Sequence, residues 1–141
     1  MTEHTPQDVE YLKKLRRFKQ LKSTWAMFFY KPYLKQIEFH TLGDSMRERA
    51  LFANNQGGKT YCAANEVAFH MTGVYPDWWQ GVRFRKAVRW GVGSETGDLL
   101  KKGPQRMLFG PMEAIGTGTI PKDLLVQPPK MSRGVPDGID T

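Results

Sequence analysis

The sequence has one cysteine, Cys62, among its 141 residues. A single cysteine excludes an internal disulfide and a zinc site built from several cysteines, and it fits a reducing cytoplasm. The chain also lacks an apolar run of about 18 residues, which a membrane-spanning helix needs. Residues 1–6 lack the basic and apolar pattern of a secretory signal. We therefore expect a protein that is neither secreted nor inserted in a membrane.

What the chain does contain is typical of one folded domain. Hydrophobic residues make up 40% of it and aromatic residues 12%. Its 21 Lys and Arg residues exceed its 14 Asp and Glu residues, which gives a net charge of +7. This excess favours a polyanionic partner or a phosphate ligand, but it is spread along the chain and forms no basic arm.

The turn within residues 50–61 carries the clearest sign of chemistry. The sequence predicts a short strand before it and a helix after it, which is the setting of a phosphate-binding loop. Lys59 would reach the β- and γ-phosphates of a nucleotide, and the Thr60 hydroxyl would bind Mg²⁺. The residues predicted to bind nucleotide here are Ala53, Asn54, Asn55, Gln56, Gly57, Gly58, Lys59 and Thr60.

The loop departs from the usual pattern G-x-x-x-x-G-K-[ST] at its first glycine, which is Ala53 here. If that position needs a positive φ, alanine carries a penalty of about 1–2 kcal/mol. Asn54 and Asn55 tolerate left-handed geometry and would absorb the sharp part of the turn. The alternative is an ordinary strand-to-helix turn in which lysine and threonine serve as caps.

Helical periodicity is clear in two places. Apolar residues recur every three or four positions from Val9 to Phe28, which predicts an amphipathic helix that begins near Thr5 and ends before Pro32. The basic residues of this helix form either a solvated face or a contact surface for DNA or an acidic partner. A second helix is predicted from Thr60 to Gly73, with Ala63, Ala64, Val67, Ala68 and Met71 on its apolar side.

Two further segments are predicted as strands, and an aromatic loop lies between them. Residues 47–52 would lead into the phosphate-binding turn, and residues 88–93 alternate apolar with polar or small side chains. Trp78 and Trp79 precede the basic residues 83–86, so this loop either stacks nucleic-acid bases or packs as a small core of its own.

A nucleotide hydrolase also needs an acidic residue at a strand end to hold the magnesium shell. After Thr60, no Asp or Glu follows a run of four apolar residues, and Glu95 is the nearest substitute. His4, His40 and His70 are scattered and do not indicate a catalytic metal centre. We therefore assign no catalytic residue and do not expect this chain alone to hydrolyse ATP.

Several segments in order resemble the front of the ATPase domain of tailed-phage large terminase subunits, the motors that package DNA into capsids. The segments that carry this resemblance are Gln36–His40, Arg47–Arg49, Asn54–Thr60, His70–Gly81, Gly116–Asp123 and Gly134–Thr141. Together they are much more specific than the loop alone. They span roughly residues 33–141.

The resemblance implies an α/β fold, an incomplete P-loop NTPase with a parallel-sheet core, preceded by the amphipathic helix. It divides the chain into the helix of residues 1–32, a partial ATPase domain of residues 33–126 and a Pro- and Gly-rich segment of residues 127–141. It also implies ATP and Mg²⁺ as cofactors, and Gln36 as an adenine-reading residue whose amide is both donor and acceptor.

The implied partners are double-stranded DNA, a small terminase subunit, the capsid portal and further copies of the chain, all in the host cytoplasm. Related subunits carry their acidic strand-end motif and nuclease further along, so the resemblance predicts a chain truncated before both. Two alternatives stay open. The chain is a non-catalytic module that binds nucleic acid or a phage protein, or it is the phosphate-binding domain of another ATPase, such as a helicase or kinase.

Overall fold

The computed structural model describes residues 5–127, 129–134, 136 and 138–139. Its helical elements follow one another along the chain without an intervening sheet. The α-helices are α1 (Pro6–Thr24), α2 (Leu34–Thr41), α3 (Lys59–Thr72), α4 (Gly97–Leu100) and α5 (Arg106–Phe109). The 3-10 helices are η1 (Ala26–Phe29), η2 (Leu42–Asp44), η4 (Met112–Ala114) and η5 (Lys122–Leu124), and η3 (Lys101–Gln105) is a π-helix.

The predicted α/β fold with a parallel sheet is wrong for the part of the chain that the structure describes. Those residues contain no strand, only isolated bridges between Thr117 and Pro121 and between Met131 and Ile139. Residues 47–52 and 88–93, both predicted as strands, are irregular. A strand is stable only when its backbone groups pair with a neighbour, and neither segment has one. Phe52 accordingly lies 92% exposed.

Both predicted helices are present, but the first ends at Thr24 and not just before Pro32, because the chain turns at Trp25 into the separate 3-10 helix η1. α1 begins with a capping box in which Thr5 and Asp8 bond to each other's backbone N–H groups. α3 runs between two left-handed glycines, Gly58 with φ 73° and Gly73 with φ 69°. The predicted end of α3 at Gly73 is therefore confirmed.

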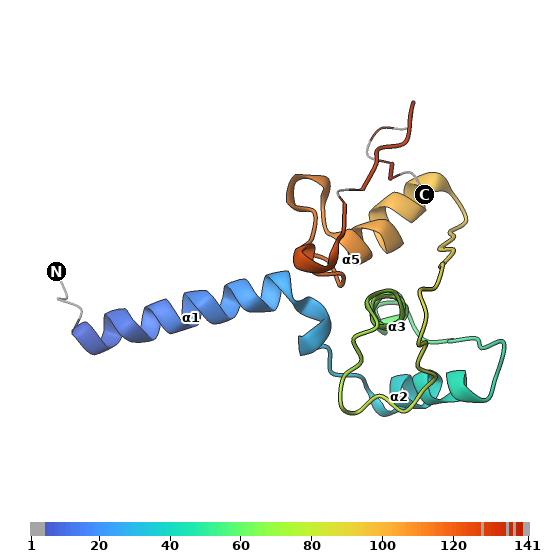
Figure 1. Ribbon diagram of the computed structural model, residues 1–141, viewed down its shortest axis with the longest axis horizontal. Coiled ribbons are helices and arrows are strands. Elements are labelled where there is room, and N and C mark those ends of the chain that lie inside the picture. The colour runs from blue at the N-terminus through green and yellow to red at the C-terminus, as the bar shows by residue number, and fades with distance from the viewer. Residues whose placement is uncertain (1–4, 128, 135, 137, 140–141) are drawn as a thin grey trace.

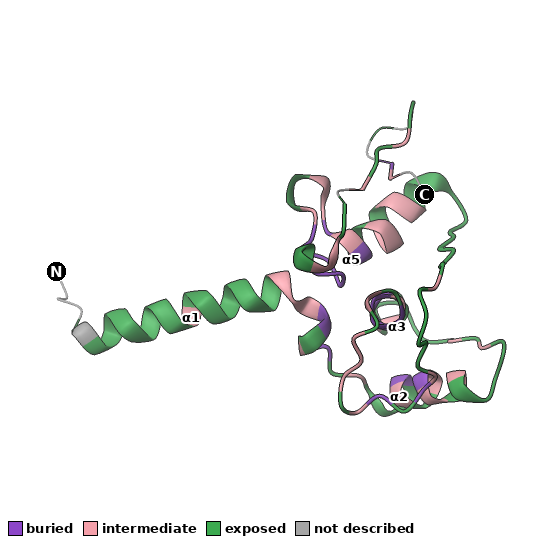
Figure 2. Ribbon diagram, viewed as in Figure 1, coloured by how far each residue is buried: buried purple, intermediate pink, exposed green. Residues whose placement is uncertain are grey.

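α1 projects away from the rest of the molecule (Figure 1) and is exposed along most of its length (Figure 2). It contacts the following 3-10 helix η1 through Phe18, whose ring is nearly perpendicular to that of Phe29, with the two ring centroids 5.5 Å apart. The basic side chains that this leaves exposed are Lys13, Lys14, Arg16, Arg17, Lys19 and Lys22. None of the described helices has both the length and the apolarity needed to cross a bilayer.

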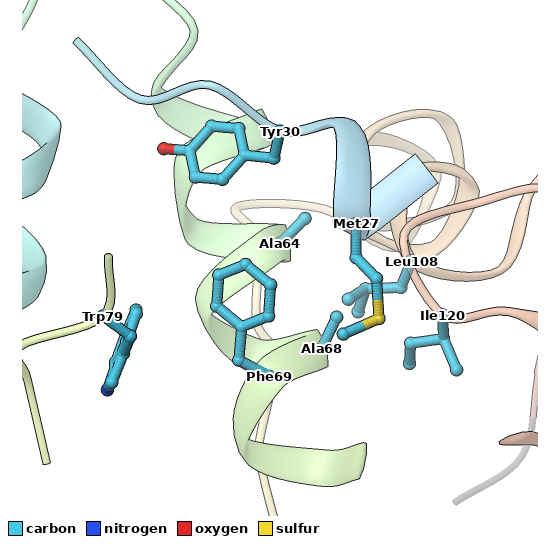
Figure 3. Packing of buried hydrophobic residues seen from close by; sticks show 8 residues of the cluster. All are labelled: Met27, Tyr30, Ala64, Ala68, Phe69, Trp79, Leu108 and Ile120. Atoms are coloured by element: carbon cyan, nitrogen blue, oxygen red, sulfur yellow. The ribbon is translucent and has the colours of Figure 1, made fainter. Parts of the chain in front are cut away.

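The core forms around α3, which lies between α2 and the segment that runs from α4 to α5 (Figure 1). Tyr30 and Trp79 approach one side of α3, and Met27, Leu108 and Ile120 approach another (Figure 3). Residues 116–121 return to this core, where the Thr119 hydroxyl donates to the Ala64 carbonyl.

The buried face of α3 differs from the predicted one. Ala64 and Ala68 are buried as expected, but Ala63 is exposed and Met71 is 48% exposed. The remaining buried positions are Cys62, Asn65, Glu66, Phe69 and His70. Polar side chains therefore occupy positions that an apolar pattern would not select, because they have partners inside the protein.

We expect Phe69→Ala to lower the free energy of unfolding by about 3–5 kcal/mol, since Phe69 is 1% exposed and its loss leaves a cavity beside α3. Phe52→Ala is the matched control, because the same truncation at an exposed site changes stability by about 0.5 kcal/mol or less. Chemical denaturation of both variants measures the difference. Equal losses would contradict the described core.

Candidate nucleotide-binding site

A tight turn links residue 53 to the start of α3. The Gly57 N–H donates to the Asn54 carbonyl at 3.1 Å, and Gln56 and Gly58 have positive φ angles of 64° and 73°. A Cβ at Gly57 would lie 3.0 Å from the Asn54 oxygen. A side chain at Gly57 would therefore crowd the Asn54 carbonyl, and the backbone of the turn forms a tight cradle at the beginning of a helix.

The left-handed geometry falls on a different residue from the expected ones. Among the described non-glycine residues, only Gln56 has a positive φ, so neither Ala53 nor the two asparagines carry the sharp part of the turn. Ala53 consequently avoids the left-handed penalty considered for it. The loop closes without its first glycine.

The Lys59 side chain folds back over this loop. Its ammonium donates to the Ala53 carbonyl at 2.5 Å and to the Asn54 carbonyl at 2.9 Å. Because α3 begins at Lys59, the unpaired amides of a helix start and its positive dipole end lie beside the same ammonium. These groups suit an anion, and Thr60 follows with its side chain exposed.

Gln36 comes to the loop from α2. Its Nε2 lies 3.5 Å from the Gly58 carbonyl, although the two residues are 22 positions apart. Gln36 is buried, and its Oε1 accepts hydrogen bonds from the Tyr33 N–H at 2.9 Å and the Tyr30 hydroxyl at 3.3 Å. The structure thus gathers all nine residues predicted to bind nucleotide.

A buried ionic cluster, the Glu66 cluster, consists of Glu66, His40, Arg49 and His70. The sequence did not predict it. Glu66 Oε2 is 2.6 Å from His40 Nδ1, and Glu66 Oε1 is 2.5 Å from Arg49 Nη2. His70 is on the next turn of α3, and its Nε2 lies 3.7 Å from Glu66 Oε1. Arg49 also donates to the Phe39 carbonyl at 2.7 Å, so the cluster joins α2, the loop after it and α3.

Burial of Glu66 disfavours its charged form and by itself would raise its pKa. Hydrogen bonds from His40 and Arg49 and the nearby His70 ring outweigh burial and hold the pKa of this carboxyl far below its usual range. Glu66 is therefore a carboxylate at neutral pH. A sequence signal did exist, because Glu66 and His70 form an i,i+4 pair within a stripe of alanine and valine.

His40 connects this cluster to the residues around Gln36. Its Nε2 lies 3.1 Å from the Tyr30 hydroxyl and 3.4 Å from the Cys62 sulfur. Burial raises the pKa of Tyr30, and its protonated hydroxyl has one hydrogen to donate, to Gln36 Oε1 or to His40 Nε2 according to the tautomer of that ring. A continuous set of polar contacts therefore runs from Glu66 through His40 and Tyr30 to Gln36.

The tryptophan loop belongs to the core. Trp79 is buried and donates from Nε1 to the Val82 carbonyl at 3.0 Å, while Trp78 and Trp79 both pack on Phe69 and His40. The packing alternative for this loop is confirmed. Its rings shield the Glu66 cluster from water.

A hollow of about 310 Å³ lies beside Lys59 and Thr60. Apolar side chains such as Leu51, Val67 and Leu108 make up much of its wall, so it does not extend the polar surface of the loop. In the described part of the chain, no three His, Cys, Asp or Glu residues form a metal-binding group. Any magnesium at Thr60 would take its other ligands from phosphate and water.

Comparison with known proteins finds a related phage protein. The protein named "Terminase, large subunit" from Salmonella phage P22 is 35% identical over an alignment of 135 residues, which covers 85% of this chain and 27% of that protein. This chain thus spans about a quarter of the length of the curated relative. No protein-family profile and no solved structure matches it.

The Glu66 cluster makes stability depend on pH. Because the folded-state pKa of Glu66 lies below its unfolded value of about 4.3, its stabilisation is complete above that pH and is lost as the pH falls toward the folded value. We expect Glu66→Gln to lower the free energy of unfolding at pH 7 by about 3–5 kcal/mol. The deficit should shrink below about pH 4.

Denaturation of the wild type and the variant from pH 2 to pH 7 measures this dependence. Glu10→Gln is the control, because Glu10 pairs with Lys14 on the exposed face of α1. Parallel pH profiles for the wild type and Glu66→Gln would rule out a stabilising carboxylate at this position.

Proposed function

The chain belongs to the terminase large-subunit family, and from that premise we propose that it binds ATP within a phage machine that packages double-stranded DNA. The observation that carries the proposal is the turn of residues 53–60. There the Lys59 ammonium, two left-handed residues and a helix start meet in one cradle. This combination supports a triphosphate ligand.

In this proposal each group of the site has a separate task. Lys59 leaves the two carbonyls it now contacts and pairs with the β- and γ-phosphates, while the backbone amides at the start of α3 hold the phosphate oxygens. Thr60 supplies a hydroxyl to Mg²⁺, and Gln36 faces the ligand from α2. Bound ATP supplies the phosphoryl group whose transfer drives such motors.

Hydrolysis is not assigned to these residues. Glu66 is a carboxylate within the turns that follow Lys59, but His40 and Arg49 already hold both of its oxygens. The proposal therefore places nucleotide binding in this chain and leaves the water-activating group to other parts of the machine. A small terminase subunit, the capsid portal and further copies of the chain are the partners proposed there, in the host cytoplasm.

A second candidate function rests on the exposed basic side chains of α1. Its six Lys and Arg residues have two acidic residues beside them in the helix, Asp8 and Glu10. Such a helix supports salt-sensitive binding to a polyanion such as DNA. This function needs neither Lys59 nor ATP, and it corresponds to a non-catalytic interaction module.

We expect Lys59→Ala to weaken binding of Mg²⁺-ATP by about 10- to 100-fold, because it removes a charge-assisted contact to phosphate. Isothermal titration calorimetry measures the affinity. Lys86→Ala removes an equal charge from an exposed position outside the turn and should leave the affinity unchanged. An equal affinity for the wild type and Lys59→Ala would count against the nucleotide site.

For the second function, the double variant Lys13→Gln/Arg17→Gln should weaken DNA binding. The slope of log affinity against log salt should become shallower by about 0.9 for each DNA phosphate that the variant no longer neutralises. Fluorescence anisotropy with duplex DNA at several salt concentrations measures this slope. The control pair Lys35→Gln/Lys86→Gln removes the same charge elsewhere, and an identical slope for both pairs would exclude α1 as the contact surface.

A further inference from the structure

One side of α1 carries an apolar stripe near the beginning of the helix. Asp8, Tyr11, Leu12 and Leu15 stand at positions i, i+3, i+4 and i+7, which places them on the same side of a helix. Tyr11 is 62% exposed and Leu12 is exposed too, because α1 projects away from the body (Figure 1). We call these four residues the Tyr11 stripe. Exposed apolar side chains that gather on one side of an element indicate a contact surface.

The Tyr11 stripe is separate from the most basic side of α1. Successive residues of a helix are about 100° apart, so positions two residues apart point in nearly opposite directions. Lys13 and Arg17 each lie two positions from a residue of the stripe, Tyr11 and Leu15, and therefore project from the other side of α1. A partner that covers the stripe leaves these two cations exposed.

A hollow of about 400 Å³ lies between the end of α1, α3 and the segment from η3 to α5. Its wall is partly apolar, with Ala26, Tyr61 and Met107, and it contains two exposed cations, Lys102 and Arg106. Its volume is in the range of sites that take a small ligand or a few side chains. This hollow is called the Arg106 hollow below.

The positive charge of the Arg106 hollow is not compensated. No Asp or Glu is among the described residues that line it. Asp98 is near Lys102 along the chain, but its carboxylate pairs with Lys101 at 3.0 Å. Within the part of the chain that the structure describes, neither Lys102 nor Arg106 lies at ion-pair distance from a carboxylate. The hollow therefore suits a segment that combines apolar side chains with a carboxylate.

The Tyr11 stripe has this combination. Asp8 forms the capping box through Oδ2, which accepts from both the backbone N–H and the hydroxyl of Thr5. Its Oδ1 is left for another donor, because a carboxylate accepts hydrogen bonds at both oxygens. Asp8 thus offers a carboxylate oxygen beside two exposed apolar side chains, Tyr11 and Leu12.

The stripe does not reach the hollow of its own chain. Ala26 lines the hollow and comes two residues after the end of α1. Tyr11 lies about 20 Å further back along the helix, and Figure 1 shows α1 leading away from α5. A neighbouring copy does not have this constraint, since its hollow can approach α1 from any side.

We propose that the Tyr11 stripe of one copy docks in the Arg106 hollow of a second copy. Tyr11 and Leu12 fill the apolar part of the hollow, and the Asp8 carboxylate meets Lys102 and Arg106. A second copy is the occupant that the structure favours, because the chain itself supplies both complementary surfaces. The two surfaces differ, so the contact is heterologous and joins copies head to tail. The proposal does not depend on the nucleotide site.

Sedimentation velocity at concentrations from about 10 μM to about 1 mM, the range of weak interfaces, tests this contact. The average mass of the wild type should rise with concentration and pass that of a dimer. Tyr11→Ser/Leu12→Ser removes the stripe, and Lys102→Glu/Arg106→Glu reverses the charge of the hollow. Each double variant alone should associate at least about tenfold more weakly than the wild type. Circular dichroism checks that both keep the helical content of the wild type.

An equal mixture of the two double variants gives the most specific result. The variant without the stripe keeps its hollow, and the variant without the hollow charge keeps its stripe. One contact is therefore restored, and the mixture should form dimers but nothing larger. A mixture that stays monomeric overturns the proposal. So does a wild type that is monomeric over the whole range, which leaves the hollow to an acidic segment of another protein.

Two further variants serve as controls. Lys13→Gln/Arg17→Gln changes the opposite side of α1, and Lys59→Ala changes the nucleotide-binding turn, so both should associate as the wild type does. A loss of association with Lys59→Ala would tie it to the nucleotide site and overturn the proposal. Association that survives Lys102→Glu/Arg106→Glu would place the contact between two α1 helices and overturn it as well.

A second measurement needs no variant and applies even if one of them does not fold. In a concentrated mixture of ¹³C-labelled and unlabelled wild type, nuclear Overhauser effects between different copies should join the Tyr11 ring to the Met107 methyl group. Met46, exposed and outside the Arg106 hollow, provides the reference methyl group. A sample that associates without a contact between Tyr11 and Met107 overturns the proposal.

Discussion

The pairing of the buried Glu66 carboxylate with His40 and Arg49 is the interaction on which the rest of the described structure depends. Removing a carboxylate from water costs several kcal/mol unless its oxygens are paired, and here both are. In the absence of a sheet between them, these contacts join α2 to α3. Trp78, Trp79 and Phe69 surround the cluster and keep water away from it. Ionic and aromatic contacts, and not paired strands, thus hold α2 against α3.

The position of α2 determines which side chain reaches the turn of residues 53–60, where we propose that nucleotide binds. Because His40 is held by Glu66, the preceding turn of α2 brings Gln36 against Gly58, and the capping contact to Tyr33 sets the direction of its amide. Gly58 has a φ of 73°, which favours glycine, and a Cβ there would lie 3.2 Å from Gln36 Nε2 and crowd this approach. Loop geometry and core packing are therefore linked through one side chain.

The sequence predicted well what local chemistry decides. The start of α1 at Thr5 and the end of α3 at Gly73 were predicted correctly, because caps act over three or four residues. The strands at residues 47–52 and 88–93 were predicted wrongly, since alternation is a local pattern while pairing needs a distant partner. His40 and Glu66 lie 26 positions apart, so spacing alone could not bring them together. The loop residues lie together because they are contiguous, whereas the contact of Gln36 with Gly58 depends on packing between positions 22 apart.

The exposure of α1 divides the molecule into two cooperative units. An isolated helix of fewer than about 12–15 residues is marginal in water, and α1, with 19, is only a little longer. Its order comes mainly from its own capping box, the Glu10–Lys14 pair and the Phe18–Phe29 contact, and not from the core. The first turns of α1 can therefore pass between helix and coil while the core stays folded. Amide hydrogens there exchange with solvent by fraying, and those of α3 exchange by opening of the core.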